Sequence, residues 1–281
     1  MSKADLHVHT SASDGIKSPE QVVRLAAEKG ISTLAITDHD TISGYLAARD
    51  FAVEMGITLI PGVEITSDYK GKECHMLGYC FDINHSRLTE MLNGQKKIRI
   101  LRAHKMVHNL NKLGFDLDFD DVMAESGTDS ISRVHIAEVL VKKTYVANKK
   151  EAFDRFLADD GPAYHKSEYW SAADVISLIK EAGGVSVLAH PGLNYLYEDL
   201  RHFLNSGLDG IEYIHPSHNY ELQKKYMDYA NNFGLLLSGG SDFHGFKDHD
   251  ISNFGTICID TVLSEKLLTL SEQRKALSPI K

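Results

Sequence analysis

The sequence predicts an α/β protein with a mostly parallel sheet, either doubly wound or closed into a barrel, and a helical segment inserted between two halves. In both halves, short apolar segments alternate with amphipathic helical segments, which is typical of parallel strands joined by helices. Over residues 86–166 this alternation stops and only helical patterns are found. With 281 residues, the chain is long enough for a barrel with one insertion.

The first expected strand, over residues 4–10, organises the rest of the chain. Leu6 and Val8 alternate with His7 and His9, so in an extended strand one face is apolar and the other carries both imidazoles. Two imidazoles on one face could chelate a metal ion. A pair of structural histidines is the alternative interpretation.

Helix and strand signals alternate through the rest of the first half. Ser18 is expected to cap a helix that has Pro19 in its first turn and ends at Gly30. No helical segment fits between the third and fourth expected strands, so we expect no crossover helix there. The other elements expected in this half are strands over 32–37, 57–63 and 73–81 and a helix over 43–55.

The inserted helical segment, residues 86–166, is expected to divide the barrel into residues 1–85 and 167–281. Its first helix covers 88–113, and the basic run over 96–105 is expected to be a solvated helix face. Shorter helices are expected over 118–124, 132–143 and 149–158. After the insertion we expect strands over 185–189, 210–214 and 235–238, helices over 171–182, 196–205 and 219–233, and a last helix from about residue 264.

Histidine and carboxylate side chains gather at or near the ends of these expected strands. In β/α barrels the C-terminal strand ends form the active site, so we expect these groups to meet there. A single histidine at a strand end is more often structural, but nine groups would suit up to three metal ions that share carboxylates. The nine are His7, His9, Asp14, His39, Glu64, His75, His190, Asp242 and His244.

The composition excludes several classes of protein. A net charge of −9 argues against tight binding to long duplex nucleic acid, but it leaves room for a small phosphorylated substrate. No apolar run approaches the roughly 20 residues of a membrane span, so no membrane partner is expected. The first strand begins too early for a signal peptide, and the three cysteines show no paired spacing, so a cytoplasmic protein with reduced thiols is expected.

Two common catalytic motifs are missing from the sequence. No Gly-x-Gly-x-x-Gly follows the first strand, which disfavours a dinucleotide-binding fold. No Gly-x-Ser-x-Gly is found, which disfavours a serine nucleophile on an elbow turn.

The strand ends resemble the motifs of the PHP (polymerase and histidinol phosphatase) family of metallophosphoesterases. The similar stretches, in the family's order, are residues 5–10, 37–40, 61–64, 188–191 and 240–244. The resemblance implies a distorted seven-stranded (β/α) barrel, the PHP fold, that holds two to three divalent ions. Mixed histidine and carboxylate ligands suit manganese, which we expect, with iron or zinc as alternatives.

The resemblance also implies which residues hold each ion. His7, His9, Glu64 and Asp242 would hold the first, Glu64, His75 and His190 the second, and Asp14, His39 and His244 the third. Several members of the family have histidine at the position of Asp14, and this departure resembles a branch that acts on nucleotides.

The insertion resembles the same branch. Residues 132–137 are similar to its Arg-Pro-His-Ile-Ala element, with Val134 in place of proline, and residues 161–166 and 215–218 also match. The resemblance implies that the insertion covers the active site. It also implies hydrolysis of nucleotide phosphate monoesters, such as nucleoside 3′,5′-bisphosphates, or of 5′-phosphorylated short oligoribonucleotides, by a hydroxide that bridges the metals.

Three side chains are expected to contact this substrate. Arg133 is the predicted phosphate clamp, since a guanidinium can bind phosphate through two parallel hydrogen bonds. Lys166 is a second predicted phosphate contact. His218 could protonate the leaving group or hold a second phosphate. A surface cation is the alternative for Arg133 and Lys166, and a structural histidine is the alternative for His218.

Other functions stay open at this stage. Histidinol-phosphate phosphatase is disfavoured by Asp14 and by the element around Arg133. An amidohydrolase also uses His-x-His on its first barrel strand, but it would not need Asp14, His39 and His244 as a further set. A non-catalytic module, such as a phosphate sensor, would not need all nine positions to be filled.

Overall fold

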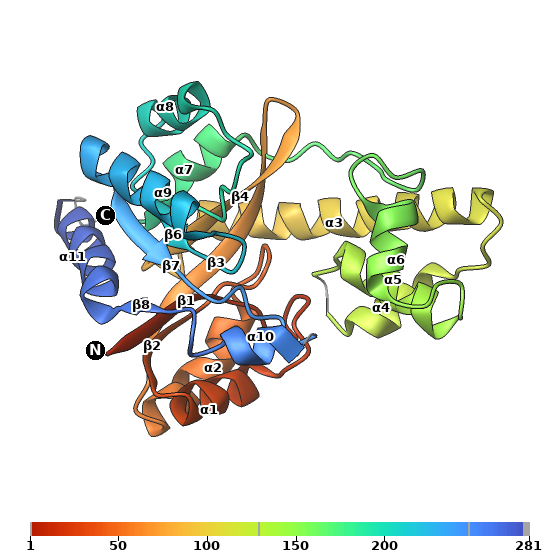
Figure 1. Cartoon of the computed structure of the whole chain (residues 1–281), viewed down its shortest axis with the longest axis horizontal. Coiled ribbons are helices and arrows are strands. Elements are labelled where there is room, and N and C mark those ends of the chain that lie inside the picture. Colours follow the sequence, from red (N-terminus) through yellow and green to blue (C-terminus); the bar gives the residue numbers. More distant parts are fainter. Residues whose placement is uncertain (1, 129, 247, 278–281) are drawn as a thin grey trace.

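The strands form one nearly closed sheet in the order β7-β6-β5-β4-β3-β2-β1-β8 (Figure 1). The computed structural model describes residues 2–128, 130–246 and 248–277, apart from the side chain of Asp248. Beyond the end of β7, Phe243 bridges Val8, and the Phe243 carbonyl accepts a hydrogen bond from the His9 amide at 2.9 Å. The strands are β1 (Lys3–Val8), β2 (Ile31–Ile36), β3 (Thr58–Tyr69), β4 (Lys72–Tyr79), β5 (Val185–Leu188), β6 (Gly210–Ile214), β7 (Leu236–Gly239) and β8 (Ile259–Asp260).

The expected distorted barrel is confirmed, but the sheet has eight strands among the described residues where seven were expected, because the two-residue β8 pairs with β1. The distortion of the barrel lies at β4. Strands β1 to β3 and β5 to β7 pair in parallel, whereas β4 runs antiparallel to both β3 and β5. A tight turn at Lys70 and Gly71 joins β3 to β4, so the absence of a crossover helix was predicted correctly. Because β4 is reversed, His75 enters the barrel from within its strand rather than from a strand end.

The helices follow the expected pattern with three differences. Helix α10 was not predicted, since its six residues carry no apolar stripe. The helix expected over 149–158 is the short α6 followed by a π-helical turn, and α11 begins earlier than residue 264. The helices are α1 (Pro19–Glu28), α2 (Ser43–Glu54), α3 (Ser86–Lys112), α4 (Phe119–Ser126), α5 (Arg133–Lys142), α6 (Lys149–Ala152), η1 (Phe153–Leu157), α7 (Ala172–Glu181), α8 (Tyr197–Asn205), α9 (Tyr220–Phe233), α10 (Asp248–Asn253) and α11 (Thr261–Leu277).

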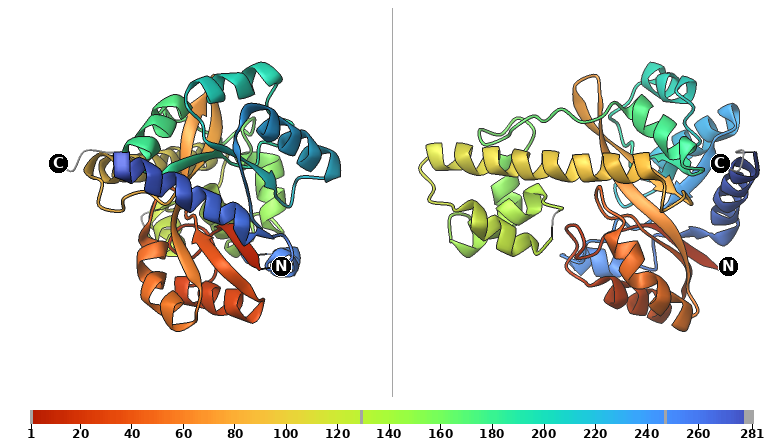
Figure 2. Two further views of the ribbon diagram at one scale, coloured as in Figure 1. Left: turned by 90° about the vertical axis from the view of Figure 1, so that its left-hand side faces the viewer. Right: turned by 180° about the vertical axis from the view of Figure 1, so that it is seen from behind.

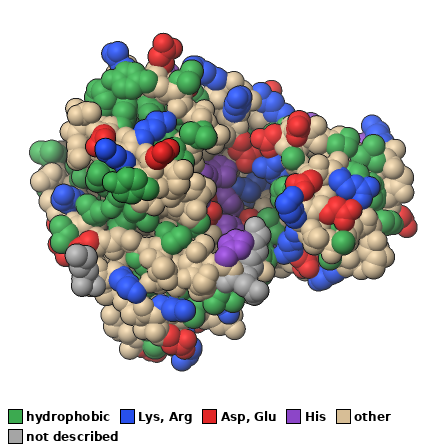
Figure 3. Space-filling model, in the orientation of Figure 1, with side chains coloured by type: hydrophobic (Ala, Val, Ile, Leu, Met, Phe, Trp, Pro, Cys, Tyr) green, Lys and Arg blue, Asp and Glu red, His purple; other side chains and the backbone are tan. Residues whose placement is uncertain are grey.

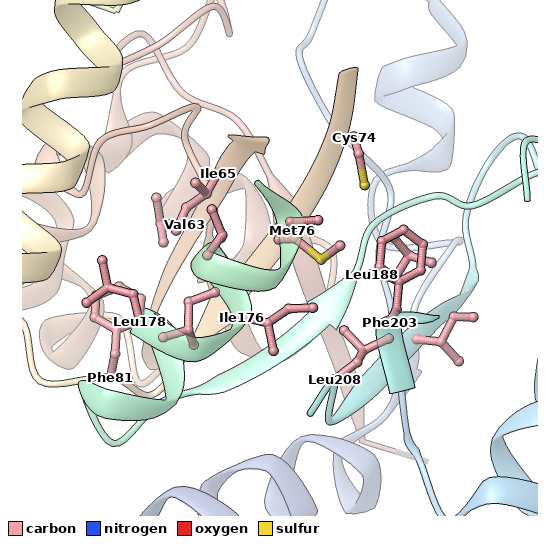
Figure 4. Close-up of a cluster of buried hydrophobic side chains, with 14 of the residues drawn as sticks. Val63, Ile65, Cys74, Met76, Phe81, Ile176, Leu178, Leu188, Phe203 and Leu208 are labelled. Atoms are coloured by element: carbon pink, nitrogen blue, oxygen red, sulfur yellow. The ribbon is translucent and has the colours of Figure 1, made fainter. Parts of the chain in front are cut away.

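The largest apolar cluster lies between the sheet and the helices that cover it (Figure 4). Val63 and Ile65 of β3 pack there with Met76 of β4 and Ile176 of α7, and all four are fully buried. Side chains alternate across a strand, so Glu64 points to the opposite face, into the barrel. The same packing that buries its two neighbours, worth roughly 1.5–3 kcal/mol for each side chain, therefore fixes the direction of Glu64.

Helix α3 belongs to both parts of the molecule. It runs from the barrel into the lobe formed by α4 to α6 (Figures 1 and 2). Near its start, Leu88 and Met91 pack into the apolar cluster of the barrel, while Met106 and Leu110 pack into a separate cluster within the lobe. The division into barrel and insertion stays a prediction, and α3 would be the shared element.

Two further findings concern membrane-spanning helices and the state of the cysteines. In the part of the chain that the structure describes, no helix is both long and apolar enough to cross a membrane. The three cysteines, all among the described residues, are free thiols: Cys74 and Cys80 are buried and Cys258 is partly so.

Candidate metal centre

The structure brings all nine predicted metal ligands into one cluster at the mouth of the barrel. Histidine side chains are visible in the hollow between the barrel and the insertion (Figure 3). Four sets of ligand atoms each lie within 4.8 Å of one another. These sets are His9, Asp14, His39 and His244; His7, Glu64 and His190; His7, His9 and Asp242; and His39, Glu64 and His75.

Glu64 is the centre of the cluster, and it is only 1% exposed. Imidazole nitrogens lie 2.8–3.4 Å from its two carboxylate oxygens, those of His7, His9 and His39 around Oε2 and those of His75 and His190 around Oε1. One carboxylate that meets five imidazoles can bridge neighbouring cations, because each oxygen faces a different set of nitrogens.

The geometry at Oε2 fits a metal ion. The Nε2 atoms of His7 and His9 lie 3.3–3.4 Å from Glu64 Oε2 and from Asp242 Oδ1. Ligand atoms about 2.1 Å from one ion lie roughly 3.4 Å apart when they surround it tetrahedrally. Each of the two nitrogens therefore has first-shell spacing to both carboxylate oxygens, while the set of atoms within 4.8 Å of one another that contains Asp242 holds His7 and His9 but not Glu64.

Asp14 is the carboxylate of a looser set on the other side of His9. Its Oδ1 lies 3.4 Å from His244 Nε2 and its Oδ2 lies 3.9 Å from His39 Nε2. The loop folds back tightly after Asp14, and a side chain at Gly15 would come within 2.6 Å of the His9 carbonyl oxygen. Glycine at this position therefore lets the loop present Asp14 to the cluster.

In two histidines, the hydrogen bond made by Nδ1 determines that Nε2 is the nitrogen available to the cluster. His7 Nδ1 lies 3.0 Å from Glu212 Oε1, and His244 Nδ1 lies 2.9 Å from the Asp242 carbonyl oxygen. Both partners are acceptors, so each Nδ1 carries the hydrogen and each Nε2 directs a lone pair into the cluster. Among the described residues, His7 Nε2, both His9 nitrogens and His39 Nδ1 are buried without a hydrogen-bond partner. Unpartnered buried nitrogens that converge on carboxylates fit bound cations.

The electrostatics keep the carboxylates ionised. Burial raises the pKa of Glu64, but the electrostatic influence of the surrounding imidazoles, those of His39, His75 and His7, outweighs burial and holds the pKa well below its usual range. Asp242 behaves in the same way: burial raises its pKa, and the neighbouring histidines lower it well below the ordinary value. Both side chains are therefore anionic acceptors at neutral pH.

The predicted substrate residues Arg133 and Lys166 lie in different parts of the structure. Arg133 begins α5, where Nη1 donates to Asp159 Oδ1 at 2.6 Å and Nη2 lies 3.9 Å from Glu73 Oε1. Lys166 is exposed, and its ammonium lies over Gly71 at the β3–β4 turn rather than beside the histidine cluster.

His218 has both ring nitrogens engaged by the backbone. Nδ1 donates to the Tyr213 carbonyl at 3.0 Å, and Nε2 accepts from the Gly192 amide at 3.1 Å. Neither a free proton nor a free lone pair is left in this arrangement, so the geometry favours the structural alternative for His218.

Sequence reasoning missed two residues that orient side chains of the cluster. Glu212 is fully buried, and besides holding His7 it accepts from the His190 amide at 2.6 Å. His215 Nε2 lies 3.2 Å from Asp242 Oδ2, and the Ser217 amide donates to His215 Nδ1, so the ring donates to Asp242. The signal in the sequence was their position at strand β6, one within it and one directly after its end.

The expectation of a solvated basic face on α3 is wrong at two positions. Arg99 and Arg102 are each 6% exposed, and Arg99 donates to Asp40 and Thr66. With Gln95, they continue the apolar stripe of the helix at helical spacing, and that spacing was the available signal. The Asp40 carboxylate therefore holds α3 against the barrel.

Two hollows flank the cluster, and Asp242 lines both. One of about 470 Å³ lies toward the insertion, and its walls include Phe153 and Phe246. The other, of about 480 Å³, lies toward the barrel loops, and its walls include His190 and Asn194. A group held at the cluster thus has space on either side for the rest of a larger molecule.

Comparison with known proteins points to one family. The family model described as PHP domain matches residues 5–235. The chain is 36% identical over 248 residues to a 5′-3′ exoribonuclease of Haemophilus influenzae, covering 86% of this chain and 90% of that protein. It is 32% identical over 250 residues to a 3′,5′-nucleoside bisphosphate phosphatase of Chromobacterium violaceum, covering 87% and 88%. A solved structure, a provisionally named metal-dependent phosphoesterase of Bifidobacterium adolescentis, superposes with a TM-score of 0.87 at 32% identity, covering 95% and 96%.

The central position of Glu64 predicts a graded loss of metal. Glu64→Gln should remove more metal than Asp14→Asn, because Glu64 faces two ligand sets and Asp14 faces one, and a neutral amide is a poorer ligand than a carboxylate. Elemental analysis of manganese per chain after dialysis measures this, with Asp154→Asn, an exposed carboxylate on η1, as the control. Equal metal content in Glu64→Gln and in the wild-type protein would contradict the assignment.

Proposed function

The chain belongs to the PHP domain family, and we propose that it is a metal-dependent phosphoesterase that hydrolyses phosphate monoesters of nucleotides or 5′-phosphorylated short oligoribonucleotides. The observation that carries this proposal is the buried Glu64 carboxylate, which has imidazole nitrogens of five histidines within 3.4 Å of its oxygens. The two substrate classes come from the names of two relatives, an exoribonuclease and a nucleoside bisphosphate phosphatase. Both activities hydrolyse a phosphate ester.

The proposed centre holds two to three divalent ions, with manganese as the expected metal. His7, His9, Glu64 and Asp242 would bind the first, Glu64, His75 and His190 the second, and Asp14, His39 and His244 the third. Of the sets of atoms within 4.8 Å of one another, one contains the whole proposed third site, and one groups Asp242 with His7 and His9. His75 and His190 fall in two different sets, each of which contains Glu64. The mixture of imidazole and carboxylate ligands supports manganese, with iron or zinc as alternatives.

Charge explains how an acidic protein would attract a phosphate. Three divalent ions and the carboxylates of Asp14, Glu64 and Asp242 together leave a local charge of about +3. Bound divalent ions supply the Lewis acidity that activates water and stabilises charge on the leaving oxygen. Glu212 and His215 hold the ligands His7 and Asp242 in fixed orientations, so the chain keeps this charge in one place.

Arg133 is the proposed phosphate clamp. Its present partner, Asp159, is 67% exposed, and exposed ion pairs contribute little to stability. A phosphate dianion can therefore replace Asp159 at small cost. We assign His218 to holding the loop after β6, where its hydrogen bonds to Tyr213 and Gly192 tie two loops together, rather than to proton donation.

Turnover of defined substrates tests the proposed function. Manganese-loaded protein should release phosphate from a nucleoside 3′,5′-bisphosphate or nucleotides from a 5′-phosphorylated oligoribonucleotide, and a chelator should abolish either activity. Histidinol phosphate and N-acyl amides serve as controls for the phosphatase and amidohydrolase alternatives. Full metal loading with no hydrolysis of any phosphate ester would contradict the proposal.

The proposed clamp predicts a selective kinetic defect. Arg133→Ala removes a charged hydrogen-bond partner worth roughly 1.5–3 kcal/mol, so kcat/KM should fall about ten- to a hundredfold with metal content unchanged. Arg155→Ala, at an exposed arginine of η1, is the matched control and should leave kcat/KM unaltered. A larger loss for a 3′,5′-bisphosphate than for a 5′-monophosphate would place Arg133 on a second phosphate. Unchanged kcat/KM on every substrate would return Arg133 to the role of a surface cation.

A further inference from the structure

Glu73 of β4 connects a proposed metal ligand to the helix that enters the insertion. Its Oε1 lies 3.3 Å from His75 Nε2, and its Oε2 lies 2.9 Å from Arg102 Nη1. The Glu73 side chain is 14% exposed and that of Arg102 is 7% exposed, so both charges are largely removed from water. Burying a charge is unfavourable unless it is paired, and Arg102 and His75 are the partners that offset the burial of the Glu73 carboxylate.

The two nitrogens of His75 face two different carboxylates. Nδ1 lies 2.9 Å from Glu64 Oε1 in the cluster, while Nε2 faces Glu73 outside it. An ionised carboxylate only accepts hydrogen bonds, so Glu73 selects the tautomer with hydrogen on Nε2. In that tautomer the lone pair of Nδ1 points into the cluster, as a metal ligand requires. Without Glu73, the competing tautomer would donate from Nδ1 to Glu64 and withdraw the lone pair.

Arg102 fixes the position of Glu73. Besides its contact with Glu73, the guanidinium donates to the His165 carbonyl at 3.2 Å and to the Tyr169 hydroxyl at 3.1 Å. It also lies over the ring of Tyr164, 5.2 Å from the ring centroid. A guanidinium held on three sides by residues 164–169, where the insertion ends, has little freedom, so it can keep the Glu73 carboxylate facing His75.

We propose that Glu73 is a positioning residue for His75 and that Arg102 holds Glu73 in place, so α3 sets the affinity of the second metal ion. The proposal rests on the proposed metal centre and adds that the centre depends on the insertion through the Arg102–Glu73–His75 contacts. Two ligands of the second ion, Glu64 and His190, are held without Glu73, so the loss of Glu73 should weaken that ion and spare the others.

Manganese titration of the full chain tests the proposal. The variants are Glu73→Gln, Arg102→Gln and the double variant, which leaves neither charge buried alone if a single variant fails to fold. Arg87→Gln is the control on the same helix, since Arg87 forms an exposed pair with Glu181. Calorimetry should show one manganese dissociation constant raised about 10- to 100-fold in Glu73→Gln, a fall in affinity typical of lost outer-sphere partners, with the other ions unaffected.

Two further measurements distinguish a positioning role of Glu73 from a general loss of structure in the variants. Activity of Glu73→Gln should recover at high manganese, and Arg102→Gln should add nothing in the Glu73→Gln background because it acts through Glu73. Unchanged manganese affinity in Glu73→Gln would overturn this inference alone, whereas no manganese uptake by the wild-type protein would overturn the proposed function with it. A lower KM for a bisphosphate with unchanged manganese binding would also overturn it, since Glu73 would then be blocking an anion site between Arg102 and Arg133.

Discussion

The arrangement of the molecule depends on one buried carboxylate. Glu64 can remain ionised at 1% exposure only because imidazoles surround both of its oxygens. Those imidazoles come from strands that are far apart in the sequence, so the charge can be satisfied only when the barrel is closed. The apolar packing of Val63 and Ile65 fixes the other half of the arrangement. Because these two side chains are buried on the outer face of β3, Glu64 between them must point into the barrel.

Reversal of β4 gives this barrel its particular chemistry. In a regular barrel the ligands come from the strand ends and the loops that follow, whereas here His75 enters from mid-strand. The same reversal brings Glu73 to the outer side of the cluster, where α3 passes. Arg99 and Arg102 of α3 then meet carboxylates of the barrel, so the insertion is tied to the cluster by buried polar contacts as well as by apolar packing.

Much of this could be predicted from the sequence, because most of the nine cluster residues lie at or just after the ends of expected strands, and the family motifs cover the same stretches. Asp14, in a loop, and His75, within a strand, were assigned to their metal sites through the resemblance. The orienting residues could not be identified in the same way. Glu212 lies within a strand and looks like any inward polar residue until His7 is placed opposite it. Likewise, Arg102 looks solvated in a basic run until the register of α3 is known, and His218 looks reactive until its backbone partners are seen. Long-range partners decide each of these roles.

Anomalous diffraction at the manganese absorption edge, from crystals grown with manganese, tests the central claim most directly. The account predicts two or three anomalous peaks inside the cluster, one of them enclosed by His7, His9, Glu64 and Asp242, with the Glu64 carboxylate between neighbouring peaks. Crystals of the loaded protein with no peak in the cluster, or with manganese only on the outer surface, would contradict it.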